Sequence, residues 1–153
     1  MKELTIIGGG LSGSEAAFQA ARRGLRVRLY EMRPSTPSGG SDLAELVCSN
    51  SLGSNLPDRA SGVLKNELRA LNSMLLECAE ATALPAGAAL AADRDAFARM
   101  VTERIQNEPN IEVIREEVTE IPSSPVIVAS GPLTSESLSK SIAALSGEEH
   151  LFF

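Results

Sequence analysis

The sequence predicts an α/β protein built on a parallel sheet, and three observations within its first 33 residues support this. A short apolar run, 4–7, leads into the turn Gly8-Gly9-Gly10-Leu11-Ser12-Gly13. An alanine-rich stretch follows and stops at Gly24, where a helix would end. A second β-rich run, 25–30, then ends on Glu31. Strand, glycine turn, helix, strand and acid in this order are typical of a dinucleotide-binding βαβ unit.

The glycine turn has a distinct expected role for each of three glycines. Gly8 lets the chain turn sharply out of the strand, and Gly13 lets the helix pack close to the sheet. Gly10 has no Cβ, so a pyrophosphate group can lie against its backbone. The free N–H groups at the start of the helix, around Leu11 and Ser12, would then face the phosphate charge.

The acid of the fingerprint is Glu31, which lies 18 residues after Gly13 at the end of the second predicted strand. A carboxylate at this position accepts hydrogen bonds from ribose hydroxyls, which favours FAD or NAD over NADP. The fingerprint does not choose between FAD and NAD. A structural glycine turn with no ligand is the alternative, and the complete context of strand, helix and acid argues against it.

The composition is that of a globular protein and argues against several other classes of protein. The 153 residues are 43% hydrophobic and 22% charged, which is ordinary for a globular domain with a real core. The net charge of −6 argues against a broad basic nucleic-acid surface on this part of the protein. Two cysteines without a CxxC pair predict neither a disulfide framework nor a metal site. No apolar run approaches the ~18 residues of a membrane span, so a cytoplasmic location is the default expectation.

The elements of the βαβ unit, 1–33, follow from local signals. Residues 11–23 are expected to be helical, with Ser12 and Glu15 placed as a capping box. The run 25–30 alternates apolar and polar residues, which predicts a strand with one covered face. It is more polar than a fully buried parallel strand, so we expect it near the sheet edge.

The segment 34–110 is expected to be a loop followed by a helical excursion. Residues 32–46 are rich in Pro, Ser and Gly, and a loop of this length is usually functional or disordered. The stretch 44–55 is small and polar, and it suits a ligand-lining turn better than a core element. Apolar residues at helical spacing then predict one long amphipathic helix over 62–82, with Cys78 as a buried hydrophobe in its apolar stripe.

Shorter elements are predicted after this helix. Residues 88–92 form a short apolar strand candidate, and Asp93 is placed to cap a helix over 94–106. Alternating residues predict a strand over 111–114 and another over 117–121.

The last predicted segment, 111–153, returns to the sheet. Residues 125–129 are expected to form a buried strand that runs into Ser130-Gly131-Pro132. Flavoproteins with two dinucleotide-binding domains bring the chain back to the cofactor after such a strand, whereas a plain turn is the alternative. Thr134 or Ser135 then opens a helix to about residue 145.

The end of the chain, 147–153, looks like the start of a further strand with no closing polar segment. We therefore expect a Rossmann-like FAD/NAD(P)-binding fold of the two-dinucleotide-binding-domain flavoprotein type, with a helical insertion, in an incomplete N-terminal fragment of a longer chain. A compact single domain that ends in a paired strand is the alternative.

Cys48 is the candidate for covalent chemistry. A thiol among Ser49, Asn50 and Ser51 on a loop near a dinucleotide suits a nucleophile or a redox partner. An unreactive small side chain is the alternative, because no basic residue lies within ten positions of it. Arg94 is expected to be a surface arginine beside a helix cap, with a contact to a flavin phosphate as the alternative.

Several motifs together resemble one family, the bacterial folate- and FAD-dependent tRNA (uracil-5-)-methyltransferases. The glycine motif is shared with many flavoproteins, whereas Tyr-Glu-Met-Arg-Pro and Leu-Val-Cys-Ser-Asn-Ser are far more specific. The similarity extends over essentially the whole chain. The matching stretches are 8–17, 29–34, 45–52, 62–65, 85–87, 92–94 and 130–135.

The resemblance implies an enzyme that transfers a methylene group from 5,10-methylenetetrahydrofolate to uridine in the tRNA T-loop. Reduced FAD supplies the electrons and NAD(P)H reduces the flavin again. The resemblance implies that Arg33, Ser130 and Gly131 join the glycine turn and Glu31 at the cofactor. It also implies a role for Cys48 near the flavin or as the uracil nucleophile.

The family's chain is much longer, so the resemblance implies that most of the tRNA-binding surface lies outside these residues. We expect the isolated chain to bind FAD weakly or not at all, and not to methylate tRNA. The loop 35–43 departs from the family by having no histidine, which puts folate or tRNA contacts from this loop in doubt. The alternatives are a flavoprotein that modifies the tRNA wobble uridine, another FAD oxidoreductase, or a non-catalytic dinucleotide-binding module.

Overall fold

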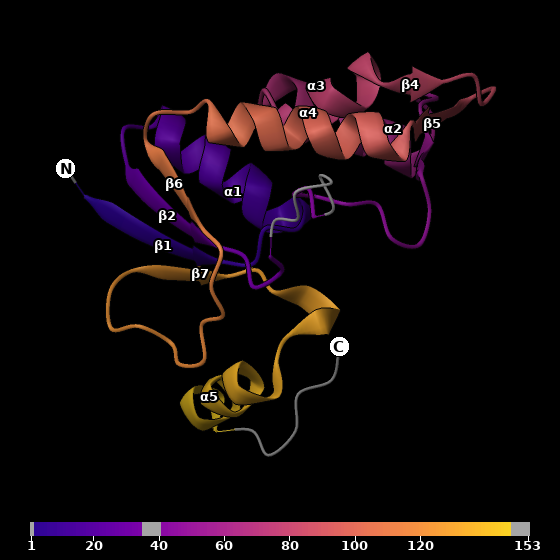
Figure 1. Ribbon diagram of the computed structural model, residues 1–153. Helices are drawn as coiled ribbons and strands as arrows, with labels where there is room; N and C mark the ends of the chain where they lie inside the picture. The colour runs from indigo at the N-terminus through magenta and orange to yellow at the C-terminus, as the bar shows by residue number, and fades with distance from the viewer. Residues whose placement is uncertain (1, 35–40, 148–153) are drawn as a thin grey trace.

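The computed structural model describes residues 2–34 and 41–147 and contains a four-stranded parallel sheet (Figure 1). Its strands lie in the order β6-β2-β1-β7, and every neighbouring pair is parallel. The strand bounds are β1 (Glu3–Ile7), β2 (Arg26–Tyr30), β6 (Ile111–Ile114) and β7 (Val126–Val128). The α/β fold class with a parallel sheet is therefore confirmed.

The βαβ unit forms as predicted, with α1 (Leu11–Arg22) joining β1 to β2. Val27 and Leu29 are fully buried in the core, which agrees with the predicted alternation along β2. The expectation that β2 lies near the sheet edge was wrong. It pairs with β1 on one side and β6 on the other, and its polar residues lie on the face opposite the core, where Arg28 reaches Glu3 and Glu112.

The predicted capping box of α1 was also wrong, because Gly10 is the N-cap and makes no side-chain capping bond. The Glu15 carboxylate turns instead to the start of another helix, α3 (Met74–Ala81). It accepts hydrogen bonds from the Met74 and Leu75 amides at 3.1 and 2.9 Å and from the Ser73 hydroxyl at 3.0 Å. Glu15 therefore caps a helix whose first residue, Met74, lies 59 positions later in the sequence.

The excursion between β2 and β6 contains a second, antiparallel sheet and three helices. The strands lie in the order β3-β5-β4, with bounds β3 (Ser51–Ser54), β4 (Ala83–Leu84) and β5 (Ala89–Ala92). The helices are α2 (Ala60–Ala70), α3 and α4 (Arg94–Gln106). In Figure 1, α3 and α4 lie above α1, on the same side of the parallel sheet.

The single long helix predicted over 62–82 is wrong, because the chain breaks into α2 and α3 around Asn72. Asn72 has a positive φ of 56°, and Ser73 caps α3 by accepting a hydrogen bond from the Leu76 amide. The apolar spacing continues across this break, so the pattern alone does not reveal it. Leu64 and Leu71 are 53% and 66% exposed, whereas Cys78 is fully buried as predicted.

The stretch 44–55 contributes two core residues and a strand, which its small polar composition does not indicate. Ala44 and Leu46 are buried in the core, and residues 51–54 form β3. The expectation that it suits a ligand-lining turn better than a core element was therefore wrong for Ala44 and Leu46, whereas Glu45 and Val47 line a pocket. The apolar residues at its start anchor it, while Cys48 remains exposed.

The predictions for β5 and α4 are confirmed. The Asp93 carboxylate caps α4 by accepting a hydrogen bond from the Ala96 amide at 2.9 Å. Phe97, Val101 and Ile105 lie at helical spacing on α4 and are fully buried.

The C-terminal segment differs from its predictions in two places. Residues 117–121 form no strand but a connection, since β6 already ends at Ile114. β7 was predicted to be buried, yet Ile127 and Val128 are 39% and 38% exposed, because β7 is an edge strand. A short 3₁₀ turn, η1 (Gly131–Leu133), follows, and Ser135 caps α5 (Glu136–Ser146) as predicted.

The predicted strand at the end of the chain lies outside the described residues, apart from Gly147, which ends α5 in a left-handed conformation. Within the described ranges, the search for a helix long and apolar enough to cross a membrane finds none.

Candidate functional site

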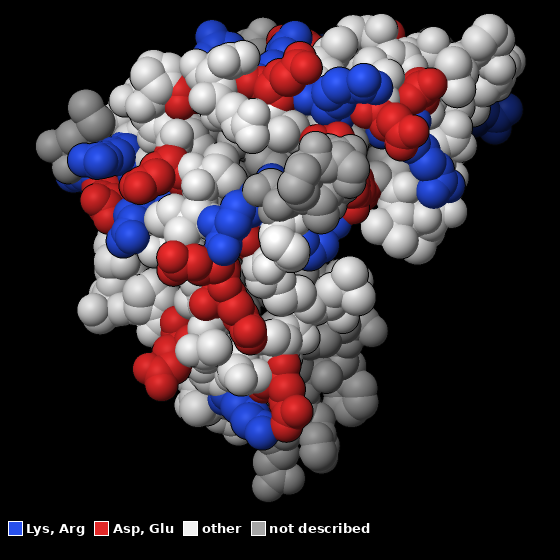
Figure 2. All heavy atoms as spheres, in the orientation of Figure 1, with Lys and Arg blue, Asp and Glu red and all other residues white. Residues whose placement is uncertain are grey.

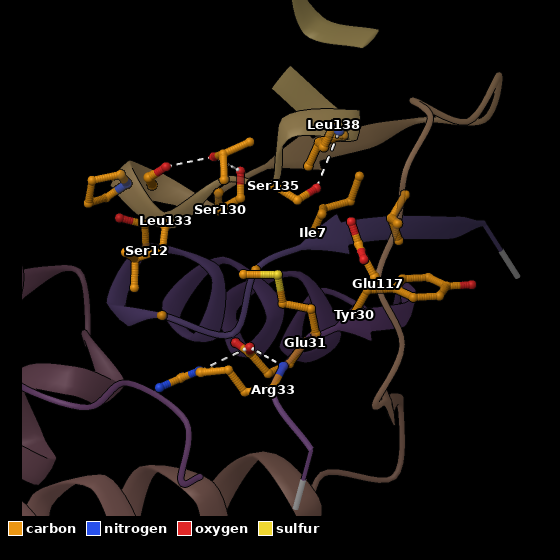
Figure 3. Close-up of a pocket in the computed structure, with 18 of the residues that line it drawn as sticks. Ile7, Ser12, Tyr30, Glu31, Arg33, Glu117, Ser130, Leu133, Ser135 and Leu138 are labelled. Atoms are coloured by element: carbon orange, nitrogen blue, oxygen red, sulfur yellow. Dashed lines mark hydrogen bonds and ion pairs between the residues drawn. The ribbon is translucent and has the colours of Figure 1, made fainter. Parts of the chain in front are cut away.

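A pocket opens at the carboxyl ends of β1 and β2 and is bordered by the turn that follows β7 (Figure 3). Its volume of about 300 Å³ lies at the lower end of the range for small-molecule sites. Glu31 and Arg33 lie on one side of it, and Ser130, Leu133 and Leu138 lie on the other. This edge is where open parallel α/β sheets bind their ligands.

Two of the four turn glycines, Gly8 and Gly13, are required by close backbone packing, and a third, Gly9, lies against side chains. A Cβ at Gly8 would lie 2.5 Å from the Ala129 carbonyl oxygen, and Gly8 also has a φ of +105°. A Cβ at Gly13 would lie 1.8 Å from the Gly8 carbonyl oxygen. A Cβ at Gly9 would meet the Leu43 side chain at 2.5 Å. These glycines let β1, α1 and the β7 turn approach each other closely.

Gly10 is different, because no contact within residues 2–34 and 41–147 requires a glycine there. An added Cβ would meet no atom of these described residues within 4 Å, and φ is −70°, which any residue adopts. Gly10 is the N-cap of α1, a position at which Ser, Asp or Asn caps a helix better than Gly. Because Gly10 lines the pocket, the space above its backbone is open to a ligand.

The start of α1 faces the pocket through Leu11 and Ser12. The first intrahelical bond runs from the Ser14 amide to the Gly10 carbonyl at 2.9 Å, so the amides before Ser14 precede the helical ladder. Unpaired amides and the positive end of the helix dipole favour an anionic group at this place.

The second turn, after β7, meets the glycine turn directly. The Ala129 amide donates to the Ile7 carbonyl at 2.7 Å, which continues the sheet up to the pocket. Gly131 has a φ of +65°, and an added Cβ there would also meet open space. The Ser130 and Thr134 hydroxyls lie 2.6 Å apart, and Thr134 donates to the Gly131 carbonyl at 2.6 Å. The structure thus brings Gly8, Gly10, Leu11 and Ser12 of the first turn and Ser130 and Gly131 of the second into one pocket, whereas the predicted Gly9 and Gly13 do not line it.

Glu31 is buried, and its carboxylate accepts hydrogen bonds from other groups of the protein. Its Oε2 accepts the Gly9 amide at 3.0 Å, and its Oε1 accepts the Arg33 amide and Nε at 3.0 and 3.1 Å. Burial acts to raise the pKa of Glu31, but the hydrogen bonds and charge of Arg33, with the Gly9 amide, lower it below its usual value. Glu31 is therefore ionised, and of about four acceptor sites on a carboxylate three are taken.

Arg33 links Glu31 to the segment that follows the glycine-rich loop. Its guanidinium pairs with Glu45 as well as Glu31, and these contacts outweigh burial and raise the pKa of Arg33. Arg115 donates to the Arg33 carbonyl at 3.1 Å and to the Ser41 hydroxyl at 2.9 Å. Arg33 lines the pocket, but in this arrangement its charge is balanced by two carboxylates.

Cys48 does not line the pocket, although its neighbour Val47 does. The thiol is exposed, and the backbone around it is held by Arg94 from the first turn of α4. Arg94 contacts the backbone of this segment and does not line the pocket. The sequence found Cys48 and Arg94 but not their proximity, because 46 positions separate them.

The sequence missed several pocket residues. Glu116, Glu117 and Val118 line the pocket from the connection after β6, which we predicted to be a strand. Leu133 and Leu138 close it from the C-terminal side. Val118 follows two acids, and Leu133 and Leu138 follow a turn. These patterns also fit ordinary strands and helices, so they did not single out pocket residues.

The surface charge in Figure 2 is mixed on the face shown. Basic and acidic side chains are interspersed over the upper part, and acidic side chains gather across the middle and lower part. No broad basic patch covers the described residues that this face displays.

The comparisons with known proteins identify close relatives of this chain. It is 57% identical over 156 residues to the methylenetetrahydrofolate–tRNA-(uracil-5-)-methyltransferase TrmFO of Rubrobacter xylanophilus, covering 100% of this chain and 35% of that protein. It is 57% identical over 153 residues to TrmFO of Bacillus subtilis, covering 98% of this chain and 35% of that protein. The chain therefore spans about a third of the length of the curated relatives that it matches.

Solved structures agree with the fold. The structure of Aquifex aeolicus GidA superimposes with a TM-score of 0.64 at 22% identity, covering 78% of this chain and 20% of that chain. The structure of FqzB gives a TM-score of 0.60 at 17% identity, covering 96% of this chain and 39% of that chain. At these identities the likeness concerns the fold alone.

The family itself is shown by the sequence match. Residues 3–151 match the family model of glucose inhibited division protein A, which is nearly the whole chain. This agrees with the parallel sheet, the glycine turn and the pocket at its carboxyl edge. The chain belongs to the glucose inhibited division protein A (GIDA) family.

Proposed function

We propose that these residues form the N-terminal, FAD-binding part of a cytoplasmic enzyme that makes 5-methyluridine in the T-loop of tRNA. In this reaction, 5,10-methylenetetrahydrofolate, uridine and reduced FAD give 5-methyluridine, tetrahydrofolate and oxidised FAD, and NAD(P)H reduces the flavin again. The relatives that are 57% identical to this chain are methylenetetrahydrofolate–tRNA-(uracil-5-)-methyltransferases, which supports this reaction and its substrates.

The observation that carries the cofactor assignment is Gly10. A Cβ at Gly8 or Gly13 would collide with backbone atoms, whereas a Cβ at Gly10 would meet no atom of the described residues within 4 Å. A ligand group that lies against its backbone gives a reason for the missing side chain. The group must be anionic, since the start of α1 is beside it.

The other pocket residues fit the remaining parts of a dinucleotide. The free acceptor site of Glu31 suits a ribose hydroxyl, and the adjacent acids disfavour a 2′-phosphate. The open space above Gly131 suits a second close approach of the cofactor to the backbone. When bound, FAD supplies the reducing electrons, and this chain's residues bind and orient it.

Cys48 is the proposed reactive residue of this part. It is exposed, next to the pocket residue Val47, and lies in the Leu-Val-Cys-Ser-Asn-Ser stretch that carries the family resemblance. A thiol in this place is free to reach a substrate carried by the rest of a longer enzyme. The residue's role is either nucleophilic or redox, as the sequence indicates.

The reaction is tested by a hybrid enzyme in which this chain replaces the matching first third of the Bacillus subtilis relative. We expect the hybrid to form 5-methyluridine in unmodified tRNA when FAD, methylenetetrahydrofolate and NADPH are supplied. Cys48→Ser should abolish product, whereas Cys78→Ala, which removes the buried thiol, should not. A hybrid that retains FAD but forms no 5-methyluridine, beside an active parent, contradicts the proposal and favours an FAD oxidoreductase.

The cofactor site is tested in the same hybrid with substitutions at Gly10. Gly10→Val should abolish FAD retention, and Gly10→Ala should weaken it, because both side chains occupy the phosphate position. The 153-residue chain with either substitution should stay folded and lose no more than about 1 kcal/mol of stability, because Ala and Val are poorer N-cap residues than Gly. FAD retention equal to the parent in Gly10→Val would contradict the assignment.

Glu31 is tested by Glu31→Ala, which should weaken FAD binding by about 1–3 kcal/mol through lost hydrogen bonds to a charged acceptor. Part of this loss comes from the Gly9 amide, which Glu31 holds in place. An unchanged dissociation constant would show that Glu31 does not serve the ribose.

A further inference from the structure

The Arg94 guanidinium binds the backbone of three successive residues from outside the pocket. Its Nη1 donates to the carbonyl oxygens of Leu46 and Val47 at 2.9 and 3.0 Å, and its Nη2 lies 3.5 Å from that of Cys48. A guanidinium presents several donors in a rigid plane, so one side chain can satisfy acceptors on consecutive residues. These bonds run from α4 to a segment 46 to 48 positions earlier.

The segment that Arg94 holds is a wall of the pocket. Glu45 and Val47 both line the pocket, and Val47 is 70% exposed. Leu46 between them is buried and anchors the segment to the core. Residues 45–48 have no helical or strand bonds of their own, so their carbonyls depend on other partners.

The backbone next to Arg94 is fixed by several hydrogen bonds. Asp93 caps α4, and the Asp93 amide donates to the Thr82 carbonyl at 2.8 Å. Just before it, the Ala92 amide donates to the Asn50 carbonyl at 3.0 Å, and the Asn50 side-chain amide donates to the Ala92 carbonyl at 3.1 Å. The 45–48 segment is thus fixed to the β5–α4 junction on both sides of Cys48.

We propose that Arg94 is a positioning residue, which holds the 45–48 segment as the pocket wall and so sets the place of Cys48 beside the pocket. The inference rests on the proposed function for the meaning of this pocket as a cofactor site. It assigns to Arg94 a role through the backbone and not through contact with a phosphate.

The experiment attaches a nitroxide spin label to Cys48 of the 153-residue chain and records its mobility. Cys78 is fully buried and stays unlabelled in the folded protein, so labelling of Cys78 reports unfolding. Arg94→Ala should give the label a new fast component on the nanosecond scale or below, with the unfolding temperature and Cys78 protection unchanged. Arg99→Ala, an exposed arginine on the same helix, is the matched control and should leave the spectrum unchanged.

The conservative variant Arg94→Lys should restore the parent spectrum only in part, because one ammonium cannot serve three carbonyls in a plane. A parent-like spectrum in Arg94→Ala would overturn the inference. Labelling of Cys78 or a lowered unfolding temperature in Arg94→Ala would overturn it as well, since Arg94 would then support the fold as a whole. Label mobility needs neither flavin nor tRNA, so these outcomes are separate from failure of the hybrid enzyme.

Discussion

The N-terminal and C-terminal regions of the described chain, 2–106 and 111–147, differ sharply in how many apolar side chains they bury. Among the described residues, every buried apolar side chain except Leu138 lies before position 107. The first region, 2–106, packs α1, α3 and α4 on one side of the sheet (Figure 1). The second region, 111–147, contains β6, β7 and α5 and leaves Ile127 and Val128 over a third exposed. The first region supplies the burial that stabilises the fold.

The weakly buried region nevertheless contributes much of the pocket. Its connection after β6 and its turn after β7 both face the glycine turn. Binding segments commonly belong to the less stable parts of a fold, carried by a rigid scaffold. The comparison teaches that the pocket lies where the well-packed region meets the weakly packed one.

The largest expected effect on this comparison comes from the core of the first region. Phe97→Ala should lower the free energy of unfolding by about 3–5 kcal/mol, because it leaves a cavity at a fully buried position. Val128→Ala in the second region should cost less than about 1 kcal/mol. Urea unfolding measures both, and equal losses would refute the division into two regions.

A second effect separates the glycines required by packing from Gly10, which no packing contact of the described residues requires. Gly13→Ala should lower the free energy of unfolding by about 1–3 kcal/mol or more, since its Cβ overlaps the Gly8 carbonyl. Gly10→Ala should change it by no more than about 0.5 kcal/mol. If thermal and urea unfolding rank these two variants the other way, Gly10 has a packing role after all.

The third effect concerns Glu31, which connects the glycine turn to the end of β2. Glu31→Gln should lower the free energy of unfolding by about 1–3 kcal/mol at neutral pH, because the charged acceptor of Arg33 and Gly9 is lost. Glu112→Gln, at an exposed ion pair with Arg28, should have little effect.

The contribution of Glu31 should depend on pH. Its pKa is lowered in the folded chain, because the Arg33 contacts and the Gly9 amide outweigh burial. The stabilisation is therefore fully present above the unfolded value of about 4.3 and is lost as pH falls through the folded pKa. Unfolding followed from neutral to acidic pH should show a smaller loss in Glu31→Gln, and an identical profile would contradict this.

The smallest effect is expected on the open face of β7. Ile127→Thr should change the free energy of unfolding by no more than about 0.5 kcal/mol, because the side chain is 39% exposed and stays β-branched. A loss of 2 kcal/mol or so, measured by urea unfolding, would mean that this edge is packed more tightly than its exposure indicates.

The sequence predicted the parts of the fold that depend on local spacing. The βαβ unit, the Asp93 cap and the buried stripe of α4 depend on residues within one turn or one strand of each other. The break at Asn72 could not be predicted in this way, because the apolar spacing continues across it and no Gly or Pro marks it. The alternation at 117–121 likewise fits a strand, but a strand requires a partner that spacing does not reveal.

The site was predictable to the extent that it is built from glycines and an acid. Both turns and Glu31 meet in one pocket, as the fingerprint indicates. The acids and apolar residues of 116–118 were missed, because their place depends on where the connection crosses the sheet. The expectation that Arg94 is a surface arginine beside a helix cap is confirmed, but its hydrogen bonds to Leu46 and Val47 could not be predicted, because only the fold brings these residues together.

The hydrogen bonds between Glu15 and the start of α3 make that helix depend on a residue that is synthesised earlier. The carboxylate oxygens of Glu15 accept the Met74 and Leu75 amides, so the first turn of α3 is capped by Glu15 of α1 together with its own N-cap residue, Ser73. During synthesis α1 leaves the ribosome before α3, and the carboxylate is in place when residues 73–75 emerge. In a circular permutant that begins after Arg22, Glu15 would be synthesised after residues 73–75, so the Met74 and Leu75 amides would lack this acceptor until translation ends.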